Sequence, residues 1–373
     1  MANQHSKVTQ TGWLGRIGQS FVGVLLGLLL FFAAFMVLYL NEGRTDFGKV
    51  AQSAVEVSLD GAAANAQGEL VSATGAVTTS ETLGDDEFLT PDTYLAFWRE
   101  VEMYAWEERT ESETARNTGG SETTETTYIY RQVWTSSPED SSSFEVSEGH
   151  ENPELLIADQ YGAATQMQIG AYQLLGDRLT LPQPDEPLDL TPESIEVSEE
   201  VTLEAAYLFQ GVGTLEEPEI GDLRIQYYAL PSGTELTVFG RLMDGVIRPH
   251  LTRRQDTFYR ALVGTRAEAI AQLKGEYKTA LWIFRVVGFF MLWIGLMLIS
   301  GPLAVFLDFL PFVGDIFRSV SGVASFFAAF LIWSVTVMIS ILLHNIVAMI
   351  AAGVAILGVW FGVKRWVLRS RDA

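Results

Sequence analysis

The sequence contains no cysteine among its 373 residues. Without thiols the chain forms no disulfide framework and no thiolate metal site, so a domain outside the cytoplasm would depend on its apolar core alone. Histidine is also scarce. The four histidines are scattered along the chain, at His5, His150, His250 and His344. This spacing predicts no multi-histidine metal site, and we expect the protein to bind neither a metal nor a cofactor.

Catalytic signatures are missing as well. There is no glycine-rich phosphate loop, no pair of histidines one helical turn apart and no nucleophile elbow of the G-x-S-x-G kind. The 46 acidic side chains are too numerous for any pair to be singled out as an acid and a base. We therefore expect a protein that is not an enzyme.

Charge is absent from long stretches of the chain. Residues 319–363 carry none and are interrupted only by His344 and Asn345, and residues 281–300 carry only Arg285. Because about 20 apolar residues cross a bilayer, we expect transmembrane helices at 17–40, within 265–300, at 319–343 and at 346–363. Residues 17–40 are too long for a cleaved signal peptide and are predicted to be an anchor.

The orientation follows from the Lys and Arg residues that flank the predicted helices. The side of both termini has Lys7, Arg16, Arg318, Lys364, Arg365, Arg369 and Arg371, and the other side has Arg44, Lys49, Lys274 and Lys278. We therefore expect both termini, residues 1–16 and the basic tail 364–373, in the cytoplasm. A bacterial inner (plasma) membrane is favoured, with the endoplasmic reticulum or inner nuclear membrane as the eukaryotic alternatives.

Nearly all ionisable residues lie between the first and second predicted helices. Residues 41–280 hold all but three of the 46 acidic side chains and 16 of the 24 basic ones, a formal net charge of −27. Such a charge repels phosphate backbones, so we expect no nucleic acid partner. The expected partners are the lipid bilayer, a second copy of the chain and other membrane proteins.

Alternating polar and apolar residues predict a β-rich domain over residues 41–264. Residues 100–113 and 122–135 form the clearest unit, a long hairpin whose tip contains Gly119 and Gly120. Residues 203–210 read as one strand. The proline-rich stretch 182–192 is predicted to be a connector between two possible lobes.

The domain is predicted to end in a helix that continues into the membrane over residues 265–300. Thr265 and Glu268 have the spacing of a capping box. Residues 301–318, broken by prolines, are expected to lie at the cytoplasmic interface. Ionisable groups at membrane depth are functional candidates, which singles out Arg285, Asp308 and Asp315; we expect the two carboxylates in water.

Small residues mark possible helix contacts. Gly23 and Gly27, and Gly358 and Gly362, have the i, i+4 spacing that lets two helix backbones approach closely. The pattern favours a compact bundle or a homo-oligomer.

Several short motifs occur in a fixed order along the chain. They are Asn41-Glu42-Gly43-Arg44, Val101-Glu102-Met103-Tyr104 with Trp106, Gly149-His150 with Asn152-Pro153, Gln168-Ile169-Gly170 and Gly221-Asp222-Leu223-Arg224. Together they resemble the landmarks of the transmembrane protein 43 (LUMA) family, of which this chain looks like a bacterial member. We prefer structural roles for these residues, such as an interfacial ion pair of Arg44 with Glu42 or a contact of Arg44 with a lipid headgroup. On the predicted strand, Arg224 is expected to pair with Asp222 two residues earlier.

The resemblance implies a four-span membrane protein with a large extracytoplasmic domain that oligomerises and organises other membrane proteins. Animal members associate with emerin and lamins, but no residue here is identifiable as a contact for them. The sequence thus predicts an α+β membrane protein with one N-terminal and three C-terminal transmembrane helices and a β-rich domain inserted after the first. We expect a non-enzymatic scaffold; the alternatives are an extracytoplasmic sensor or ligand-binding module and, less favoured, a transporter or membrane enzyme.

Overall fold

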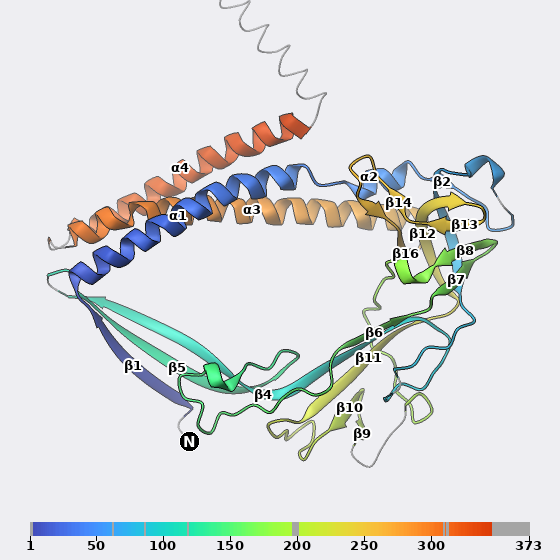
Figure 1. Cartoon of the computed structure of the whole chain (residues 1–373), viewed down its shortest axis with the longest axis horizontal. Helices are drawn as coiled ribbons and strands as arrows, with labels where there is room; N and C mark the ends of the chain where they lie inside the picture. Colours follow the sequence, from blue (N-terminus) through green and yellow to red (C-terminus); the bar gives the residue numbers. More distant parts are fainter. Residues whose placement is uncertain are drawn as a thin grey trace, which may run out of the picture. The chain divides into compact units, whose positions relative to one another are not determined.

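The computed structural model describes residues 3–61, 63–85, 87–117, 119–195, 201–308, 310 and 313–344, and Figure 1 labels their elements. The contacts divide the chain into two units. The first, which we call the β body, comprises residues 1–7, 46–112 and 125–275. The second, the helical unit, comprises residues 8–45, 113–124 and 276–373.

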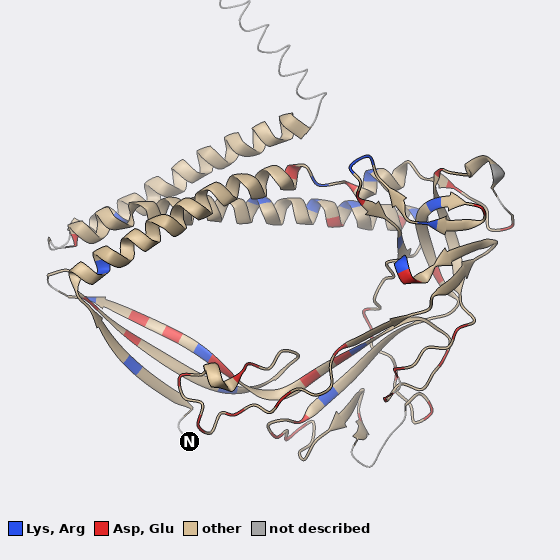
Figure 2. Cartoon of the chain, viewed as in Figure 1, with Lys and Arg blue, Asp and Glu red and all other residues tan. Residues whose placement is uncertain are grey.

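Three helices among the described residues are long and apolar enough to cross a membrane. The first is α1 (Trp13–Glu42), which begins before and ends after the expected 17–40. It is preceded by a strand, β1 (Gln4–Thr11), where a tail was expected. Figure 2 shows that the middle of α1 carries no charged residue. Its packed side shares a core with the other two helices, made of Ala34, Leu38, Leu292, Ala329 and Val337.

The second apolar helix, α3 (Arg266–Leu307), is one unbroken element of 42 residues. The Thr265 amide and hydroxyl both donate to the Glu268 carboxylate at 2.8 Å, which forms the cap that the sequence predicts. The helix also passes through Pro302, where a break was expected. Proline is tolerated in apolar helices because neighbouring groups and local adjustments satisfy the carbonyl that it leaves free.

The third, α4 (Val313–His344), starts within the stretch that was expected to lie flat at the interface. Residues 301–318 thus include the end of α3 and the start of α4. The predicted helix 346–363 and the basic tail 364–373 lie outside the described residues.

One sheet is built around the long hairpin of β4 (Tyr94–Arg116) and β5 (Glu122–Thr135). Its strand order is β1-β5-β4-β11-β10-β9, and β6 (Gln160–Ala163) also pairs with β4. β11 (Leu223–Pro231) pairs antiparallel with β4, and β10 (Tyr207–Gln210) with β11 and β9 (Val201–Glu204). Residues 203–210 are therefore two strands, because the chain turns at Ala205, which has a positive φ of 53°.

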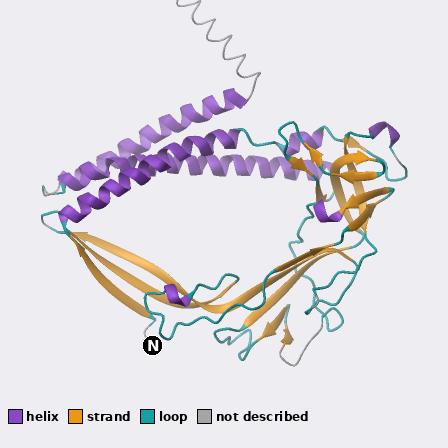
Figure 3. Cartoon of the chain, viewed as in Figure 1, coloured by secondary structure: helices purple, strands orange, loops and turns teal. Residues whose placement is uncertain are grey.

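The second sheet closes on itself. Its ring consists of β3 (Leu70–Thr78), β12 (Thr234–Met243), β13 (Val246–Arg248), β8 (Tyr172–Leu175) and β7 (Gln166–Ile169), which pairs back to β3. β16 (Arg260–Val263) and β2 (Val55–Glu56) extend it, and β14 (His250–Leu251) pairs with β15 (Thr257–Phe258) beside it. Figure 3 shows these short strands. Apolar residues of the ring form the largest core cluster.

The remaining segments pack onto these two sheets. A short helix, α2 (Phe47–Gln52), is capped by the Asp46 carboxylate, which accepts from the Lys49 amide. The connector 182–192 lies within the β body, where Leu190 is buried in a core cluster with strands β4 and β11. Three 3₁₀ turns complete the body, at Ala64–Ala66, Ser141–Ser143 and Gly176–Arg178.

Candidate functional site

In the helical unit, the tip of the β4–β5 hairpin lies against the start of α1. Gly120 adopts a positive φ of 81°, and a Cβ added there would come within 2.6 Å of the Trp13 indole. The Gly120 carbonyl accepts from the Arg16 guanidinium at 2.5 Å. On its other side Trp13 donates its indole N–H to the Val305 carbonyl at 2.9 Å. A glycine is therefore required at this point of the tip, because a side chain would collide with Trp13.

Six charged side chains meet at this end of the helices. Arg16 pairs with Glu122 at 2.8 Å and with Asp308 at 2.7 Å. Asp308 also pairs with Arg318, which reaches Asp315 at 3.5 Å. The circuit closes through Arg116 of the hairpin, which contacts Asp315 at 2.5 Å and Glu122 at 3.1 Å. We call this set the charge ring: Arg16, Asp308, Arg318, Asp315, Arg116 and Glu122.

The ring alternates in sign and sums to zero, with three guanidinium groups and three carboxylates. Its two most buried members are Arg16 and Asp308, whose side chains are only 5% and 3% exposed. Charges removed from water are tolerated when they are paired and hydrogen-bonded. The ion pairs therefore connect the hairpin tip with the start of α1, the end of α3 and the start of α4.

The ring corrects one expectation. Asp308 does not lie in water, because its carboxylate is buried, whereas Asp315 is 65% exposed as expected. The hairpin tip, which belongs to the domain predicted to lie outside the cytoplasm, contacts Arg16 through Gly120 and Glu122. The sequence could not reveal this, because the paired residues lie more than 100 positions apart.

A second polar cluster lies where α1 ends. The Arg285 guanidinium binds the Glu42 carboxylate through two hydrogen bonds, of 2.7 and 2.9 Å. The Asn41 side-chain amide donates to the Leu281 carbonyl at 2.9 Å. Arg44 does not form the expected ion pair with Glu42. Its guanidinium instead lies over the Phe284 ring, 4.9 Å from the ring centroid. Gly43 serves as the C-cap of α1. The polar side chains at the end of α1 are therefore hydrogen-bonded to α3. In the sequence, Arg285 marked this cluster as a charge in an apolar run, but its partner was not identified.

The glycines of α1 serve packing within the chain. A Cβ at Gly27 would lie 2.8 Å from the Gly295 carbonyl, and one at Gly295 would lie 2.9 Å from the Gly27 carbonyl. α1 and α3 therefore cross backbone to backbone at this point. Gly23 of α1 faces Leu298 of α3 with more room, because a Cβ added at Gly23 would lie 3.8 Å from the Leu298 side chain. Gly358 and Gly362 lie outside the described residues.

In the β body, several motif residues gather around Asn152. Its side-chain oxygen accepts from the Trp106 amide at 2.7 Å, and its side-chain nitrogen donates to the carbonyls of Trp106 and Glu139. His150 is 2% exposed, stacks on Tyr130 at 3.9 Å and donates from Nδ1 to the Val146 carbonyl. Burial and the hydrogen bond to Glu108 raise the pKa of Tyr130 to about 12. The cluster fixes the loop after the hairpin.

The Gly221-Asp222 pair shapes a neighbouring turn. Asp222 is buried, and its carboxylate accepts from the amides of Val212, Gly213 and Glu219 at 2.7 to 3.1 Å. Gly221 has a positive φ of 98°, and a Cβ there would come within 2.9 Å of the Pro153 ring. A carboxylate that accepts several backbone hydrogen bonds organises a loop.

Arg224 and Glu102 lie opposite each other on β11 and β4 and form an ion pair of 2.6 Å. The guanidinium also stacks over Trp134 at 4.7 Å and Tyr207 at 5.2 Å. Met103, one residue along β4, is buried on the other face of the sheet. The expected pairing of Arg224 with Asp222 is thus replaced by a cross-strand pair.

One buried ion pair was missed altogether. The Asp85 side chain is fully buried and binds Arg99 at 2.7 Å and the Tyr227 hydroxyl. Burial alone would raise the pKa of the Asp85 carboxyl, but hydrogen bonds from Tyr227 and from the Phe88, Leu89 and Glu87 amides outweigh it and lower the pKa. Burial and the Asp85 carboxylate raise the pKa of Tyr227. No motif marks these residues, which come together only when the sheet forms.

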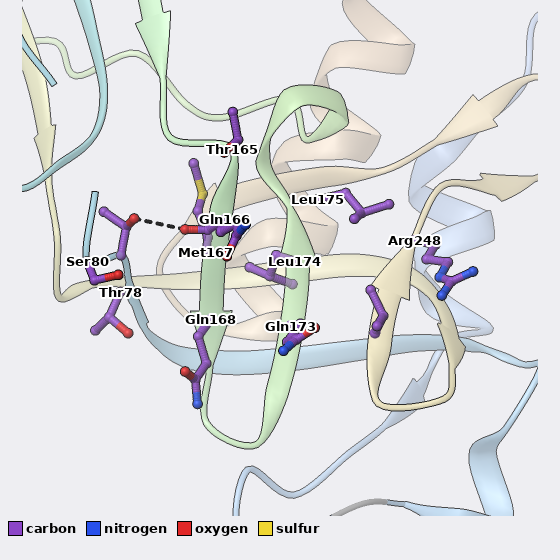
Figure 4. A pocket seen from close by; sticks show the side chains of 12 residues that line it. Thr78, Ser80, Thr165, Gln166, Met167, Gln168, Gln173, Leu174, Leu175 and Arg248 are labelled. Atoms are coloured by element: carbon purple, nitrogen blue, oxygen red, sulfur yellow. Dashed lines mark hydrogen bonds between the residues drawn. The ribbon is translucent and has the colours of Figure 1, made fainter. Parts of the chain in front are cut away.

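Two open grooves lie among the described residues of the β body. The larger, of about 610 Å³, lies beside β7, β8 and β13 and is lined by polar side chains that include Gln166, Gln168 and Arg248. Figure 4 shows Gln166 and Gln168 along β7. The Thr79 hydroxyl donates to the Gln166 carbonyl at 2.8 Å. The second, of about 580 Å³, lies between Trp98, Tyr161 and the turn at Asp177 and Arg178. Within the described residues no group of His, Asp and Glu is arranged to hold a metal ion.

Known proteins resemble this chain over most of its length. The family model of Transmembrane protein 43 matches residues 103–346. Transmembrane protein 43 of Rattus norvegicus is 28% identical over 336 residues, which cover 84% of this chain and 83% of that protein. The Homo sapiens protein is 27% identical with the same coverage, and the Drosophila melanogaster homolog is 26% identical over 73% of this chain and 74% of its own length. No solved structure matches. The family model covers well over half of the sequence, so this apolar-helix and β-rich membrane protein belongs to the transmembrane protein 43 family.

Proposed function

We propose that this protein is a non-enzymatic membrane scaffold, which holds an acidic β body at a membrane surface and binds other membrane proteins. The continuity of α3 carries the proposal. Its first turns bury Ala269, Ile270 and Leu273 in a core cluster of the β body, and the same helix continues as an apolar segment of the helical unit. A β body that shares a continuous helix with an apolar segment is suited to presenting a binding surface at a membrane.

Self-association is part of the proposal. Because Gly27 already packs on Gly295, we expect copies to meet through other helix faces. Four membrane-spanning helices and a bacterial inner membrane remain predictions, supported by the long apolar runs and the basic flanks. The same flanks favour a cytoplasmic location of both termini.

The test is purification in mild detergent followed by mass photometry and crosslinking in native membranes. We expect a particle larger than one chain and reproducible membrane-protein partners. A variant with the exposed Met338→Ala and Leu331→Ala changes on α4 probes one outward face, and Leu14→Ala on α1 is the matched control. A strictly monomeric chain without partners would contradict the scaffold.

A sensor or ligand-binding module is the second candidate, and the 610 Å³ groove favours it. Its polar lining of glutamine, threonine and serine side chains suits a hydrogen-bonding ligand. A screen of small polar compounds by thermal shift, with Gln168→Ala as the variant, tests it. A transporter or membrane enzyme is less favoured, since Arg285, Asp308 and Asp315 are all engaged in ion pairs. Full function after neutralisation of all three would remove it.

A further inference from the structure

The β body is acidic as a whole, but one part of it is basic. Residues 241–260 contain five arginines and two acids, Asp244 and Asp256, a formal charge of +3 in a chain whose net charge is −22. Figure 2 shows blue in this part of the body, including the turn between β14 and β15. Because charges in water are screened beyond about 8 Å at physiological ionic strength, this local excess decides what the surface attracts. Four of the arginines are exposed, and we call them the arginine face: Arg241, Arg248, Arg253 and Arg254.

The turn between β14 and β15 presents Arg253 and Arg254 side by side. The Thr252 amide donates to the Asp256 carbonyl at 2.9 Å, and the Gln255 amide donates to the Thr252 carbonyl at 2.9 Å. Among the described residues neither arginine has an ion pair or a side-chain hydrogen bond. A guanidinium offers a planar fork of N–H donors that matches the oxygens of a phosphate. The turn therefore holds two such forks ready for an anion.

Two more arginines extend this surface onto the neighbouring strands. Arg241 of β12 and Arg248 of β13 lie directly opposite each other in an antiparallel pair, so their side chains project from the same side of the sheet and repel. Arg241 donates to the Gly68 carbonyl at 2.8 Å, and neither arginine pairs with a carboxylate in the part of the chain that the structure describes. Burial and the Arg241 guanidinium lower the pKa of His250, which follows β13. An anion bound here would relieve the repulsion.

The arginine face lies close to the points where the chain enters its apolar helices. Phe258 of β15 stacks on Phe47 of α2 at 5.1 Å, and α2 begins five residues after α1 ends. Phe258 also shares a buried cluster with Leu273 of α3. The apolar run of α3 begins at Leu281, eight residues further along the same helix, a distance of about 12 Å. Strand β15, which directly follows the arginine turn, therefore packs on the segment that leads into the membrane.

We propose that the arginine face binds the phosphate headgroups of anionic phospholipids. Each arginine near an anionic membrane surface strengthens binding about fivefold. Leu251, beside the arginine turn, is 57% exposed and supplies an apolar contact for the lipid. The apolar helices of the chain keep such lipids within its reach. The inference rests on the proposed membrane scaffold and deepens it, because bound headgroups hold the β body at the membrane surface.

Titration of a short-chain phosphatidylglycerol into the full-length protein in a non-ionic detergent, followed by isothermal titration calorimetry, tests the proposal. The turn variant carries Arg253→Gln and Arg254→Gln. The matched control carries Arg109→Gln and Arg178→Gln, which remove two exposed arginines elsewhere in the β body. Short-chain phosphatidylcholine, which has no net charge, and inorganic phosphate are titrated in parallel.

We expect phosphatidylglycerol to bind the wild type and the control variant equally and the turn variant about 30-fold more weakly. Phosphatidylcholine should bind all three proteins weakly. An equal loss in the control variant would show that net charge, and not the arginine face, attracts the lipid. Unchanged affinity of the turn variant would overturn the proposal, and so would inorganic phosphate that binds as tightly as phosphatidylglycerol, because the ligand would then be a free anion.

A second variant guards against misfolding of the first. If the turn variant does not fold, Arg248→Gln alone should weaken phosphatidylglycerol binding about fivefold, and unchanged affinity of this variant then overturns the inference. Carbonate extraction tests the scaffold separately. Release of the chain from membranes would remove the scaffold, whereas retention with unchanged lipid affinity in the variants removes only the lipid-binding face.

Discussion

Replacing Asp308 by asparagine tests whether the charge ring holds the helical unit together. The substitution keeps the shape of the side chain and removes its charge from Arg16 and Arg318, both of which contact the same carboxylate oxygen. Removal of one partner from a buried ion pair costs roughly 3–5 kcal/mol. Because Arg16 keeps Glu122 at 2.8 Å, we expect about 2–4 kcal/mol for Asp308→Asn.

The matched control is Asp315→Asn in the same ring. Its side chain is 65% exposed, and exposed ion pairs contribute roughly 0–1 kcal/mol. Thermal unfolding in detergent should therefore show a loss of several degrees for Asp308→Asn and almost none for Asp315→Asn. Arg16→Gln should resemble Asp308→Asn, and the double variant should lose less than the sum, because the two residues contact each other.

Equal effects of the two substitutions would refute the reasoning, since exposure would then not decide the cost. Additive effects of Arg16→Gln and Asp308→Asn would show that the two side chains do not interact. Raising the salt concentration should weaken the contribution of Asp315 more than that of Asp308, because buried pairs are screened less.

Three further predictions concern other contacts. Asp85→Asn should destabilise the β body by roughly 3–5 kcal/mol. Because the pKa of Asp85 is lowered in the folded state, the stability that the carboxylate contributes is present above about pH 4 and is lost as the pH falls. Chemical unfolding at a series of pH values should therefore show that the free energy of unfolding falls less steeply at acid pH in the variant than in the wild type. Gly27→Ala should lower the thermal midpoint because its Cβ would meet backbone at 2.8 Å, whereas Gly23→Ala, with 3.8 Å, should be tolerated. Asn152→Ala leaves the Trp106 amide without its acceptor and should cost about 1–3 kcal/mol, read from the urea midpoint, with a change in tryptophan fluorescence.

Some local elements follow directly from the residue pattern. The alternation over residues 122–135 predicted the second arm of the hairpin, and β5 has those bounds. The Thr265 and Glu268 spacing predicted the cap of α3, because a capping box depends on residues three positions apart. Where the prediction failed, at residues 203–210, the turn uses Ala205 in a left-handed conformation, which alanine rarely adopts and no pattern marks.

The ion pairs follow another rule. Arg285 and Asp308 were marked as unusual because a charge in an apolar stretch is rare, but their partners Glu42 and Arg16 were not identified. Which side chains form an ion pair depends on which distant segments of the chain come together in the fold. The acidic side chains are so numerous that the sequence does not indicate which of them pairs with a given arginine. Asp85 and Arg99 had no local signal at all.

The sequence by itself determined the apolar helices, the acidic β-rich body and the family, because hydrophobic runs, period-two patterns and ordered motifs are local properties of the chain. Only the tertiary structure decided which charges meet, that Gly27 packs on Gly295 within one chain, and that β1 and the hairpin share a sheet. The physical reason is that a local pattern fixes what each segment prefers to bury, whereas the choice of partner depends on closing loops of a hundred residues or more.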